Sequence, residues 1–258
     1  MKKDIPILID FDGVIRLGSG LAADAFEFLN FLHSENLPFI IITNSTRDSS
    51  DDLKNILAHN GVGFNVNIMT TVDATIEYIK EKNLSVSVYC IKNIRHRFEE
   101  FINDKDPRAV VIGDLGTGWS YGILNEIFNK VYGGAEIIAM QKNKFWKPDG
   151  IELALDAGAF ITAIEYASGK NSVLIGKPSP IYFHTAIKMP GCPAGSPFLM
   201  IGDDLENDIK PAQELGGKGI LLYTGKTKFP LRQDSKIHPD YDAKNLTDVI
   251  ELLKDILQ

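Results

Sequence analysis

Short apolar runs rich in β-branched residues alternate with helix-patterned segments along almost the whole chain. The runs begin with IPILID, PFIIITN and VNIMT, and the pattern returns near the C-terminus as PFLMIGD and KGILLYT. Helical periodicity separates them, at about residues 22–35, 50–60, 72–82, 205–215 and 246–257. Continuously apolar strands are buried on both faces, so we predict an α/β fold with a parallel sheet covered by helices on both sides.

A second set of strands lies in the middle of the chain. SVSVYC, AVVIGD and AEIIAM are three further runs with helix-patterned segments between them. In a chain of 258 residues, so many strands predict a second, smaller α/β unit inserted into the first. We place this insertion at residues 80–171, which leaves residues 1–79 and 172–258 as the core.

Composition narrows the class of protein. The apolar fraction is 44%, which is typical of a soluble globular protein, and the net charge of −7 argues against a nucleic-acid or membrane partner. No apolar run approaches the ~18 residues of a membrane span, and the first residues lead straight into a strand, leaving no room for a signal peptide. Cys90 and Cys192 have no metal-ligand spacing and are interpreted as free thiols. We therefore predict a cytoplasmic protein.

The stretch PILIDFDGVI, residues 6–15, ends an apolar run in two carboxylates. Side chains two apart on a strand point to the same side, so Asp10 and Asp12 are expected to face one site. In parallel sheets, ligands bind at the carboxyl ends of the strands, where this pair lies. Gly13 then lets the backbone turn away sharply. A turn or a helix cap explains a single aspartate, but this pair indicates catalysis or metal binding.

A second acidic cluster follows another apolar run, in MIGDDLENDI. Its aspartates are Asp203, Asp204 and Asp208. They are expected near the first pair, on a neighbouring strand, and like charges this close repel unless a cation or a proton intervenes. Oxygen ligands without cysteine or histidine favour a hard cation, and Mg²⁺ binds one or two carboxylates together with a phosphate. One of Asp203 and Asp204 is equally suited to cap the helix that follows.

Two shorter elements add groups that suit a phosphate. In ITNSTR, the hydroxyl of Thr43 and the backbone amide at Asn44 follow an apolar run, and such groups at a strand end hold phosphate oxygens. In VLIGKPSPIYF, Lys177 also follows an apolar run, and its ammonium would balance phosphate and carboxylate charge. Each element alone is ordinary loop chemistry. Together with the acidic clusters they indicate a phosphate site.

In chain order, DFDGV, TNS, GKPSP and GDDLENDI resemble the four sequence motifs of the haloacid dehalogenase (HAD) superfamily of phosphotransferases. The resemblance implies a Rossmann-like HAD core with a parallel sheet and an inserted α/β cap. The long insertion between the second and third motifs is similar to the type II cap of the NagD-like branch. FWKPDGIELALDAGAFITAIEYAS and GILLYTGK resemble the part of that branch that contains phospholysine phosphohistidine inorganic pyrophosphate phosphatase. The resemblance covers nearly the whole chain.

The family implies a phosphoric monoester hydrolase, a Mg²⁺-dependent phosphatase that acts on a small phosphorylated metabolite through an aspartyl-phosphate. Asp10 would be the nucleophile. Asp12 would protonate the leaving oxygen and then activate the hydrolytic water. Lys177 would stabilise Asp10 and the transferring group. Such a division of labour agrees with the chemistry, because covalent catalysis by a carboxylate splits one hard displacement into two easier ones.

The family also implies the ligands of the phosphate and of the metal. Thr43 and the backbone at Asn44 would hold the phosphoryl oxygens. Asp10, the backbone carbonyl of Asp12 and Asp203 would bind Mg²⁺. The metal ligands would be supported from outside by a further aspartate, and the sequence leaves open which one: Asp204 or Asp208.

Departures from the family occur in the cap. Relatives tend to carry a Gly-Pro-Gly-like stretch where this chain has LDAG, and Asp156 adds a negative charge there. The inherited substrate is therefore open. A basic and aromatic segment of the cap is a further candidate for substrate contact: Lys142, Lys144, Trp146 and Lys147. Type II caps often take part in dimer contacts, so the resemblance leaves open a homodimer formed through the cap.

Two other activities of the superfamily fit this sequence less well than a phosphatase does. A dehalogenase needs neither an acid like Asp12 nor a metal cluster. Phosphomutases of this superfamily usually carry a helical cap between the first two motifs, and the roughly thirty residues between Asp12 and Thr43 are too few for one. The alternative that stays open is a catalytically silent binding protein or a phospho-accepting regulatory protein. The lifetime of the phospho-aspartate separates these alternatives, because a phosphatase hydrolyses it quickly and a switch does not.

Overall fold

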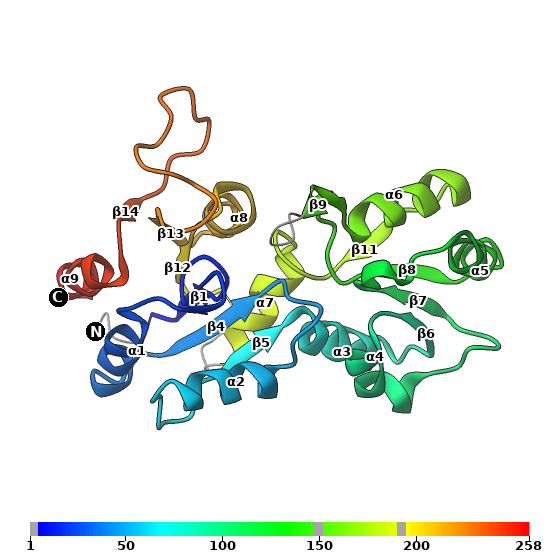
Figure 1. Cartoon of the computed structure of the whole chain (residues 1–258), viewed down its shortest axis with the longest axis horizontal. Coiled ribbons are helices and arrows are strands. Elements are labelled where there is room, and N and C mark those ends of the chain that lie inside the picture. The colour runs from blue at the N-terminus through cyan, green and yellow to red at the C-terminus, as the bar shows by residue number, and fades with distance from the viewer. Residues whose placement is uncertain (1–4, 147–151, 190–194, 258) are drawn as a thin grey trace. The chain divides into compact units, whose positions relative to one another are not determined.

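The computed structural model describes residues 5–146, 152–189 and 195–257 (Figure 1). The chain forms two compact units. The first comprises Met1–Thr43, Ser50–Met69 and Lys177–Gln258, and the second comprises Asn44–Ser49 and Thr70–Gly176. The insertion that we predicted at 80–171 lies inside the second unit. That unit begins earlier than the predicted insertion, because the helix α3 (Thr71–Lys82) and a short segment further upstream also belong to it.

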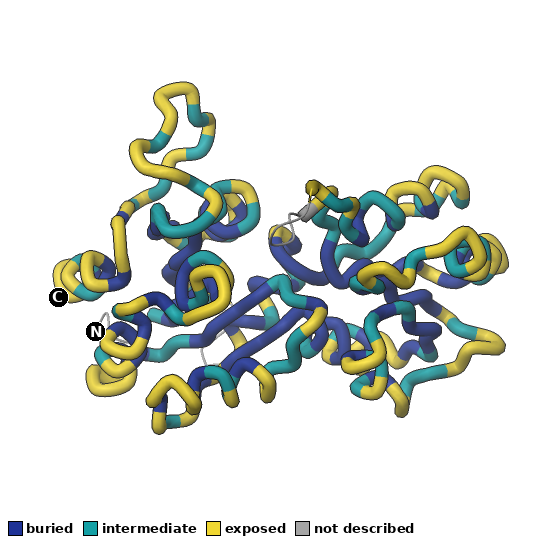
Figure 2. The backbone as a smooth tube through the Cα atoms, in the orientation of Figure 1, coloured by how far each residue is buried: buried dark blue, intermediate teal, exposed yellow. Residues whose placement is uncertain are grey.

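The first unit contains a six-stranded sheet with the order β14-β13-β12-β1-β4-β5. Its strands are β1 (Ile7–Asp10), β4 (Phe39–Thr43), β5 (Ile68–Thr70), β12 (Leu199–Gly202), β13 (Lys218–Leu222) and β14 (Tyr241–Ala243). β1 pairs with β4 and β12 in parallel, as do β12 with β13 and β13 with β14. Ile7, Leu8 and Ile9 have no exposed surface, as expected of a central strand covered on both faces (Figure 2). The predicted α/β fold with a parallel sheet is confirmed.

Four helices of the first unit lie where the periodicity predicts them: α1 (Ala25–Ser34), α2 (Ser50–His59), α8 (Lys210–Glu214) and α9 (Leu246–Leu257). A further helix, α7 (Pro180–Lys188), was not predicted. Phe28 and Leu32 of α1 and Val249 and Leu253 of α9 are buried in the same hydrophobic core. This core holds one face of the sheet, so the strand ends that carry the motifs have a rigid support.

Two details of the first unit differ from the prediction. The helix expected at 205–215 begins with a π-helical segment, Leu205–Ile209, before α8. Directly after β1, an unpredicted hairpin pairs two short strands, β2 (Arg16–Leu17) and β3 (Gly20–Leu21). Strands of two residues are too short for a periodic pattern, so they leave no signal in the sequence.

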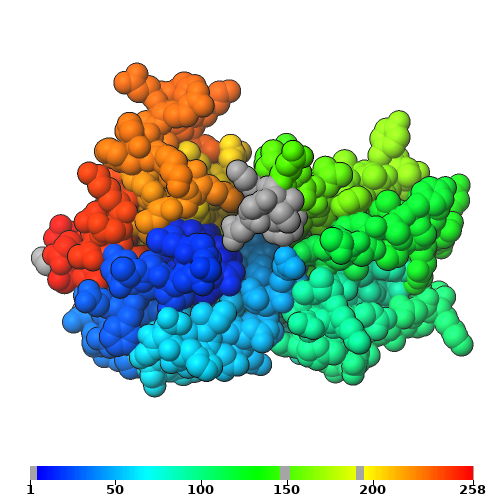
Figure 3. Space-filling view, viewed as in Figure 1, coloured from blue at the N-terminus to red at the C-terminus, as the bar shows by residue number. Residues whose placement is uncertain are grey.

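A long loop joins β13 to β14. Residues 223–240 contain neither helix nor strand, and none of them is buried. The loop projects from the surface of its unit, in orange in Figure 3.

The second unit has its own four-stranded parallel sheet, with the order β11-β8-β7-β6. Its strands are β6 (Val86–Tyr89), β7 (Ala109–Ile112), β8 (Glu136–Ala139) and β11 (Ser172–Leu174), beside a small antiparallel pair, β9 (Phe145–Trp146) and β10 (Ala154–Leu155). Its helices are α3, α4 (Lys92–Arg95), α5 (Tyr121–Tyr132), α6 (Ala157–Ser168) and the 3-10 segments His96–Phe101 and Gly116–Gly118. Val110 and Ile137 of the sheet share a core with Ile127 and Ile161 of the helices.

The remaining sequence expectations concern thiols and membranes. Cys90 is a buried free thiol, and burial raises its pKa to about 12, so it is protonated at neutral pH. Cys192 lies outside the described residues. Across the described ranges, no helix has both the length and the apolar character of a membrane span. The cytoplasmic location stays a prediction.

Candidate active site

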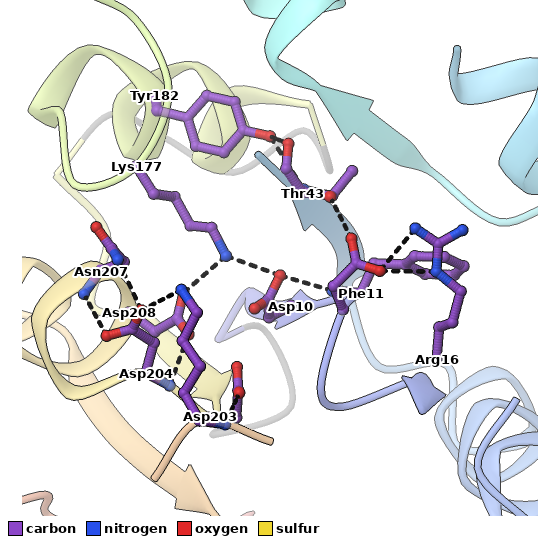
Figure 4. A network of polar contacts seen from close by, with 12 residues as sticks. Asp10, Phe11, Arg16, Thr43, Lys177, Tyr182, Asp203, Asp204, Asn207 and Asp208 are labelled. Carbon is purple, nitrogen blue, oxygen red and sulfur yellow. Dashed lines mark hydrogen bonds and ion pairs between the residues drawn. The ribbon is translucent and has the colours of Figure 1, made fainter. Parts of the chain in front are cut away.

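Asp10, the last residue of β1, lies at the centre of the site and is only 6% exposed. Its Oδ1 accepts a hydrogen bond from the backbone amide of Phe11 at 2.8 Å and pairs with Nζ of Lys177 at 2.7 Å (Figure 4). Among the described residues, no hydrogen bond engages Oδ2 of Asp10. Two donors on one oxygen therefore orient the carboxylate and leave the other oxygen available to an electrophile.

Three carboxylates gather at this point of the sheet. Asp10, Asp203 and Asp208 are buried, and one oxygen of each lies within 4.8 Å of the others. Asp203 directly follows β12, which pairs with β1, so the two predicted neighbouring strands are indeed adjacent. Asp208 comes from the π-helical segment. Nζ of Lys177 lies 2.7 Å from Oδ1 of Asp208, so one buried lysine bridges two of the three carboxylates.

Two glycines make room for this cluster. Gly13 has a φ of +93°, and a Cβ there would overlap the carboxylate of Asp203. A Cβ at Gly202 would overlap the side chain of Asp208. The glycines in the first and fourth motifs are therefore required by close packing against carboxylates, and at Gly13 also by the backbone conformation.

The cluster carries an excess of negative charge. Burial raises the pKa of Asp10 well above its ordinary value; Lys177 opposes this rise, and Asp208 and Asp203 add to it. Burial, together with Asp208, likewise raises the pKa of Asp203. Burial by itself would lower the pKa of Lys177, but Asp10 and Asp208 raise it above its ordinary value, so this lysine is charged.

The donor set fits a divalent cation. Three carboxyl groups surround one ammonium, so full ionisation of the three would leave two negative charges without compensation. A dipositive ion would neutralise them and relieve the mutual repulsion. Buried carboxylate oxygens with no sulfur or imidazole among them are the ligands that Mg²⁺ prefers.

Asp12 lies beside this cluster and is more exposed, with 47% of its side chain accessible. Its Oδ2 accepts a hydrogen bond from the hydroxyl of Thr43 at 3.1 Å. Its Oδ1 pairs with Arg16, whose Nη2 and Nε are both 2.7 Å away. The carboxylate is thus accessible and held at both oxygens, which suits a group that exchanges protons with a bound molecule.

Thr43 ends β4 and is fixed from behind by Tyr182 of α7. The Tyr182 hydroxyl accepts a hydrogen bond from the Thr43 amide at 3.0 Å. It also lies 2.7 Å from the carbonyl oxygen of Thr43 and 2.8 Å from that of Met69, and both oxygens can accept its proton. Tyr182 has no exposed surface. A buried hydroxyl therefore ties the ends of β4 and β5 to α7 and determines where the Thr43 side chain lies.

Asp204 has a different role from its neighbours. Its side chain caps the π-helical segment by accepting from the amides of Glu206 and Asn207, at 2.9 and 3.2 Å. It also accepts from Nζ of Lys226 at 2.6 Å. Burial by itself would raise the pKa of Asp204, but Lys226 and Asn207 lower it below its ordinary value. The side chain of Asp208 is thus part of the buried cluster, whereas Asp204 contacts the cluster through its backbone amide, which donates to Oδ2 of Asp208 at 3.1 Å.

The loop after β13 encloses Asp203. The backbone amide of Lys226 donates to Oδ2 of Asp203 at 2.5 Å, and a Cβ at Gly225 would overlap the same carboxylate. The hydroxyl of Thr224 donates to the carbonyl oxygen of Gly13. This loop therefore fixes both Asp203 and the turn after the first motif.

Several predicted residues belong to the second unit. Asn44 directly follows Thr43 and is half-buried, with Oδ1 so close to Gly176 that a Cβ there would lie 2.7 Å away. Lys142 donates to both carboxylate oxygens of Glu165, at 2.9 and 2.8 Å. Lys144 is exposed. Lys142 is therefore engaged within its own unit.

Asp156 has a structural explanation. It caps α6 by accepting from the amide of Ala157 at 2.6 Å, and it accepts from the side chain of the buried Gln141 at 2.7 Å. A Cβ at Gly158 would overlap the backbone carbonyls of Lys142 and Asn143, which explains the glycine two residues on. Nothing in the structure described assigns Asp156 to a substrate. Trp146 ends β9, and Lys147 lies outside the described residues.

Sequence reasoning missed three residues that contact the site. Arg16 pairs with Asp12, Tyr182 holds Thr43, and Lys226 contacts Asp203 and Asp204. Arg16 is four residues after Asp12, a spacing that has no meaning outside a helix until the hairpin is known. Tyr182 fits the apolar pattern of its helix and gave no sign that its hydroxyl is used. Lys226 lies in a stretch, GILLYTGK, whose family resemblance could have directed attention to it.

Comparisons with known proteins agree with this geometry. A family model described as haloacid dehalogenase-like hydrolase matches residues 7–102, and a second model of HAD-like hydrolases matches residues 174–249. In Bos taurus, the haloacid dehalogenase-like hydrolase domain-containing protein 2 is 32% identical over 237 residues, covering 90% of this chain and 88% of its own. In Rattus norvegicus, phospholysine phosphohistidine inorganic pyrophosphate phosphatase is 29% identical over 256 residues, covering 96% and 93%.

Solved structures show the same fold. The 4-nitrophenylphosphatase of Thermotoga maritima has a TM-score of 0.87 and 25% identity, with 97% of both chains covered. NagD of E. coli has a TM-score of 0.84 at 22% identity, covering 95% of this chain and 98% of its own, and shows likeness of fold alone. Since a relative 32% identical spans nine-tenths of the sequence and family models match both of its ends, the resemblance expected from the four motifs is confirmed. The chain belongs to the haloacid dehalogenase-like hydrolase family.

Proposed function

We propose that the chain is a Mg²⁺-dependent phosphatase that hydrolyses a small phosphorylated metabolite through an aspartyl-phosphate on Asp10. The observation that carries the proposal is the difference between the two carboxylate oxygens of Asp10 in their contacts. One oxygen is held by Phe11 and Lys177, and the other is free of hydrogen bonds from the described residues. Asp12, two residues on, offers an accessible carboxyl. The name of the Thermotoga maritima structure, 4-nitrophenylphosphatase, supports this reaction class.

In the first step, Oδ2 of Asp10 attacks phosphorus and forms the new P–O bond while the bond from phosphorus to the leaving oxygen breaks. The carboxyl proton of Asp12 passes to the leaving oxygen, so the alcohol departs neutral and Asp12 becomes a carboxylate. General acid catalysis of this kind contributes typically ~10²–10⁴-fold in rate. Lys177 supplies a fixed positive charge next to the attacking carboxylate.

In the second step, a water molecule attacks the phosphorus of the aspartyl-phosphate. The Asp12 carboxylate takes a proton from this water, and the bond between phosphorus and Oδ2 of Asp10 breaks. Inorganic phosphate leaves, Asp10 is again a carboxylate, and Asp12 is again protonated. The backbone amide of Asn44 would hold the phosphoryl oxygens, and so would the hydroxyl of Thr43, which donates to Asp12 in this structure and would have to turn to the phosphate.

Asp10, Asp203 and the backbone carbonyl of Asp12 would hold Mg²⁺, and Asp208 would support them from the same buried cluster. Bound there, Mg²⁺ supplies positive charge that offsets the repulsion between an anionic nucleophile and an anionic phosphate. The predicted set of ligands named Asp208 or Asp204 as the outer support. The geometry favours Asp208, because Asp204 is committed to capping and to Lys226.

We also propose that residues 80–171 act as the type II cap that selects the substrate. Asp10, Asp12, Lys177 and Asp203 all belong to the first unit, and of the residues assigned to the phosphate only Asn44 belongs to the second. Selectivity is then left to the inserted segment. A homodimer formed through the cap stays a prediction.

Hydrolysis of p-nitrophenyl phosphate tests the proposed function. We expect turnover with Mg²⁺, none with a chelator, and none from Asp10→Asn. Asp51→Asn is the matched control, because Asp51 is a mostly exposed aspartate of α2 in the same unit, and it should match the wild type. Full turnover by Asp10→Asn would contradict the assigned nucleophile.

A second measurement addresses the alternative of a silent or regulatory protein. Folded, Mg²⁺-loaded protein is assayed against a panel of sugar, nucleotide, amino-acid and pyrophosphate substrates. Absence of turnover across the panel and of p-nitrophenyl phosphate hydrolysis would favour the alternative. A phospho-aspartate that lasts minutes instead of seconds would identify a switch.

A further inference from the structure

Two nitrogen atoms of the Arg16 guanidinium contact one carboxylate oxygen of Asp12. These atoms, Nε and Nη2, both lie 2.7 Å from Oδ1 of Asp12. The other oxygen, Oδ2, accepts the hydrogen bond from Thr43 at 3.1 Å. An aspartate with nearly half of its side chain exposed would otherwise change rotamer freely, so these contacts restrict it to one orientation.

The guanidinium is itself held in place. Its central carbon lies 4.9 Å from the centroid of the buried Phe11 ring, within the range of a cation–π contact. The backbone amide of Arg16 donates to the carbonyl of Phe11 at 2.8 Å, and the carbonyl of Arg16 accepts from the amide of Gly13, also at 2.8 Å. The hairpin therefore fixes Arg16 at both the backbone and the side chain, on the residues that flank Asp12.

We infer that Arg16 is a positioning residue for Asp12 and that it supports the cleavage of phosphate esters with basic leaving groups. The inference rests on the proposed function, in which Asp12 donates a proton to the leaving oxygen. A misplaced acid matters most when the leaving group is a strong base, because such a group needs its proton early. A planar fork stacked on an aromatic ring cannot be reproduced by the point charge of lysine.

Two aryl phosphates of similar shape separate an effect of Arg16 on protonation of the leaving group from an effect on substrate binding or on the fold. The p-methylphenolate of p-methylphenyl phosphate resembles a tyrosinate, whose conjugate acid has a pKa of about 10, whereas p-nitrophenolate is a much weaker base. The quantity to measure is kcat/KM with Mg²⁺, because it reports the steps up to departure of the leaving group and not the later hydrolysis of the intermediate. Both esters carry a para-substituted phenyl ring.

For Arg16→Gln, we expect kcat/KM to fall roughly tenfold with p-methylphenyl phosphate and less than about threefold with p-nitrophenyl phosphate, a part of the full contribution of a general acid. Arg16→Lys should show the same dependence on the leaving group with a smaller loss. Arg232→Gln is the matched control, because Arg232 pairs with Asp234 on the surface with 83% of its side chain exposed, and it should leave both values unchanged. Thermal unfolding of each variant reports whether it is folded.

Two results would overturn the inference. Equal losses with both esters, in Arg16→Gln and in Arg16→Lys, would mean that Arg16 acts on the fold or on phosphate binding. Unchanged values with both esters would mean that Asp12 needs no such support. If the wild-type protein hydrolyses neither ester, the comparison is made with two esters of the natural panel that differ in leaving-group basicity; absence of turnover across that panel as well means that the proposed function fails and the inference with it.

Discussion

Among the described residues, Lys177 is the single positive charge inside a cluster of buried carboxylates. The balance between its charge and theirs affects both the stability of the fold and the binding of a cation. Its Nζ contacts Asp10 and Asp208, each at 2.7 Å, and its side chain is 4% exposed. Burial of a charge is costly unless it is paired, so removal of any member leaves the others without compensation. Burial raises the pKa of both Asp10 and Asp203, and the neighbouring carboxylates add to this rise.

The first prediction concerns pH without metal. The folded chain keeps protons on Asp10 and Asp203 at pH values where the unfolded chain, with carboxyl pKa values of about 4, has lost them. The contribution of Asp203 to the free energy of unfolding is therefore present below about pH 4 and is lost as pH rises through its raised pKa. Urea unfolding with chelator should show the wild type losing stability relative to Asp203→Asn as pH rises. A difference that is constant with pH would contradict the raised pKa.

The second prediction concerns the metal at pH 7. Under the proposed function, Mg²⁺ would bind the folded cluster and not the unfolded chain, so it should stabilise the wild type by about 2.7 kcal/mol at a hundred times its Kd. A chain of this size gains about 2–4 °C in Tm for each kcal/mol. Asp203→Asn should show little or no such gain. An equal gain in both proteins would place the bound ion elsewhere.

The third prediction concerns Gly202. An alanine there would place Cβ against Asp208, and relief would require a shift of the buried cluster or of β12. We expect Gly202→Ala to lose roughly 1–3 kcal/mol of stability, the usual cost of overpacking, and to lose most phosphatase activity. Gly20→Ala is the control, since nothing lies within 4 Å of a Cβ there. Chemical denaturation and the p-nitrophenyl phosphate assay measure both effects.

At the scale of elements, the site depends on how each strand end is joined to the next helix or hairpin. α7 begins soon after Lys177 and carries Tyr182 back to Thr43 and Met69, so one helix connects the third motif to the second. The hairpin of β2 and β3 holds the first motif in place, because its Arg16 pairs with Asp12. The motifs are thus held by contacts between elements as well as by the sheet.

The fourth prediction tests the contact made by α7. Tyr182→Phe removes a buried hydroxyl and leaves the amide of Thr43 without the partner that the hydroxyl provides. We expect a loss of roughly 1–3 kcal/mol in the free energy of unfolding, the cost of burying polar groups without partners, and a lower kcat/KM because Thr43 is displaced. Tyr166→Phe, at a side chain 92% exposed, should stay within about 0.5 kcal/mol of the wild type. Equal stability of both variants would refute the structural role of Tyr182.

Sequence patterns predicted the larger elements and most of the motif positions, for physical reasons. The strands and the long helices bury apolar side chains with a regular period, and that period is visible in IPILID or in the segment that forms α9. The choice between Asp204 and Asp208 was not visible, because both lie within one helical turn and only the backbone decides which one caps. Arg16 was missed because its contact is created by two-residue strands, and Tyr182 because a buried tyrosine satisfies the same apolar pattern as phenylalanine.

At the scale of the whole molecule, the chain consists of two units with separate sheets and separate cores. In the first unit, the residues assigned to chemistry come from both ends of the sequence and meet because β1 and β12 are neighbours. The loop 223–240 lies in the same unit and contains no buried residue. Folding stability should therefore be unevenly distributed over the molecule, with this loop at the low end.

The fifth prediction concerns that loop. Limited trypsin digestion of the native protein should cut within 223–240 before it cuts any described helix, because exposed loops fit a protease without unfolding. The exposed basic residues there include Lys228, Arg232 and Lys236. Mass spectrometry of the first fragments identifies the site. A first cut inside α5 or α9 would show that a packed helix opens more readily than the loop.

The chain contributes to the second unit twice, through Asn44–Ser49 and through Thr70–Gly176. The hydroxyl of Thr71 donates to the carbonyl of Ser45 at 2.8 Å, so the short segment is bonded to the long one. If only a gene fragment encoding 70–176 were transferred to a paralogue, Thr71 would be separated from Ser45 and would face the paralogue's own residues instead. Recombination between paralogues must therefore exchange two fragments at once to transplant this unit intact. Gradual point substitution within it is then the more accessible evolutionary route to a new substrate.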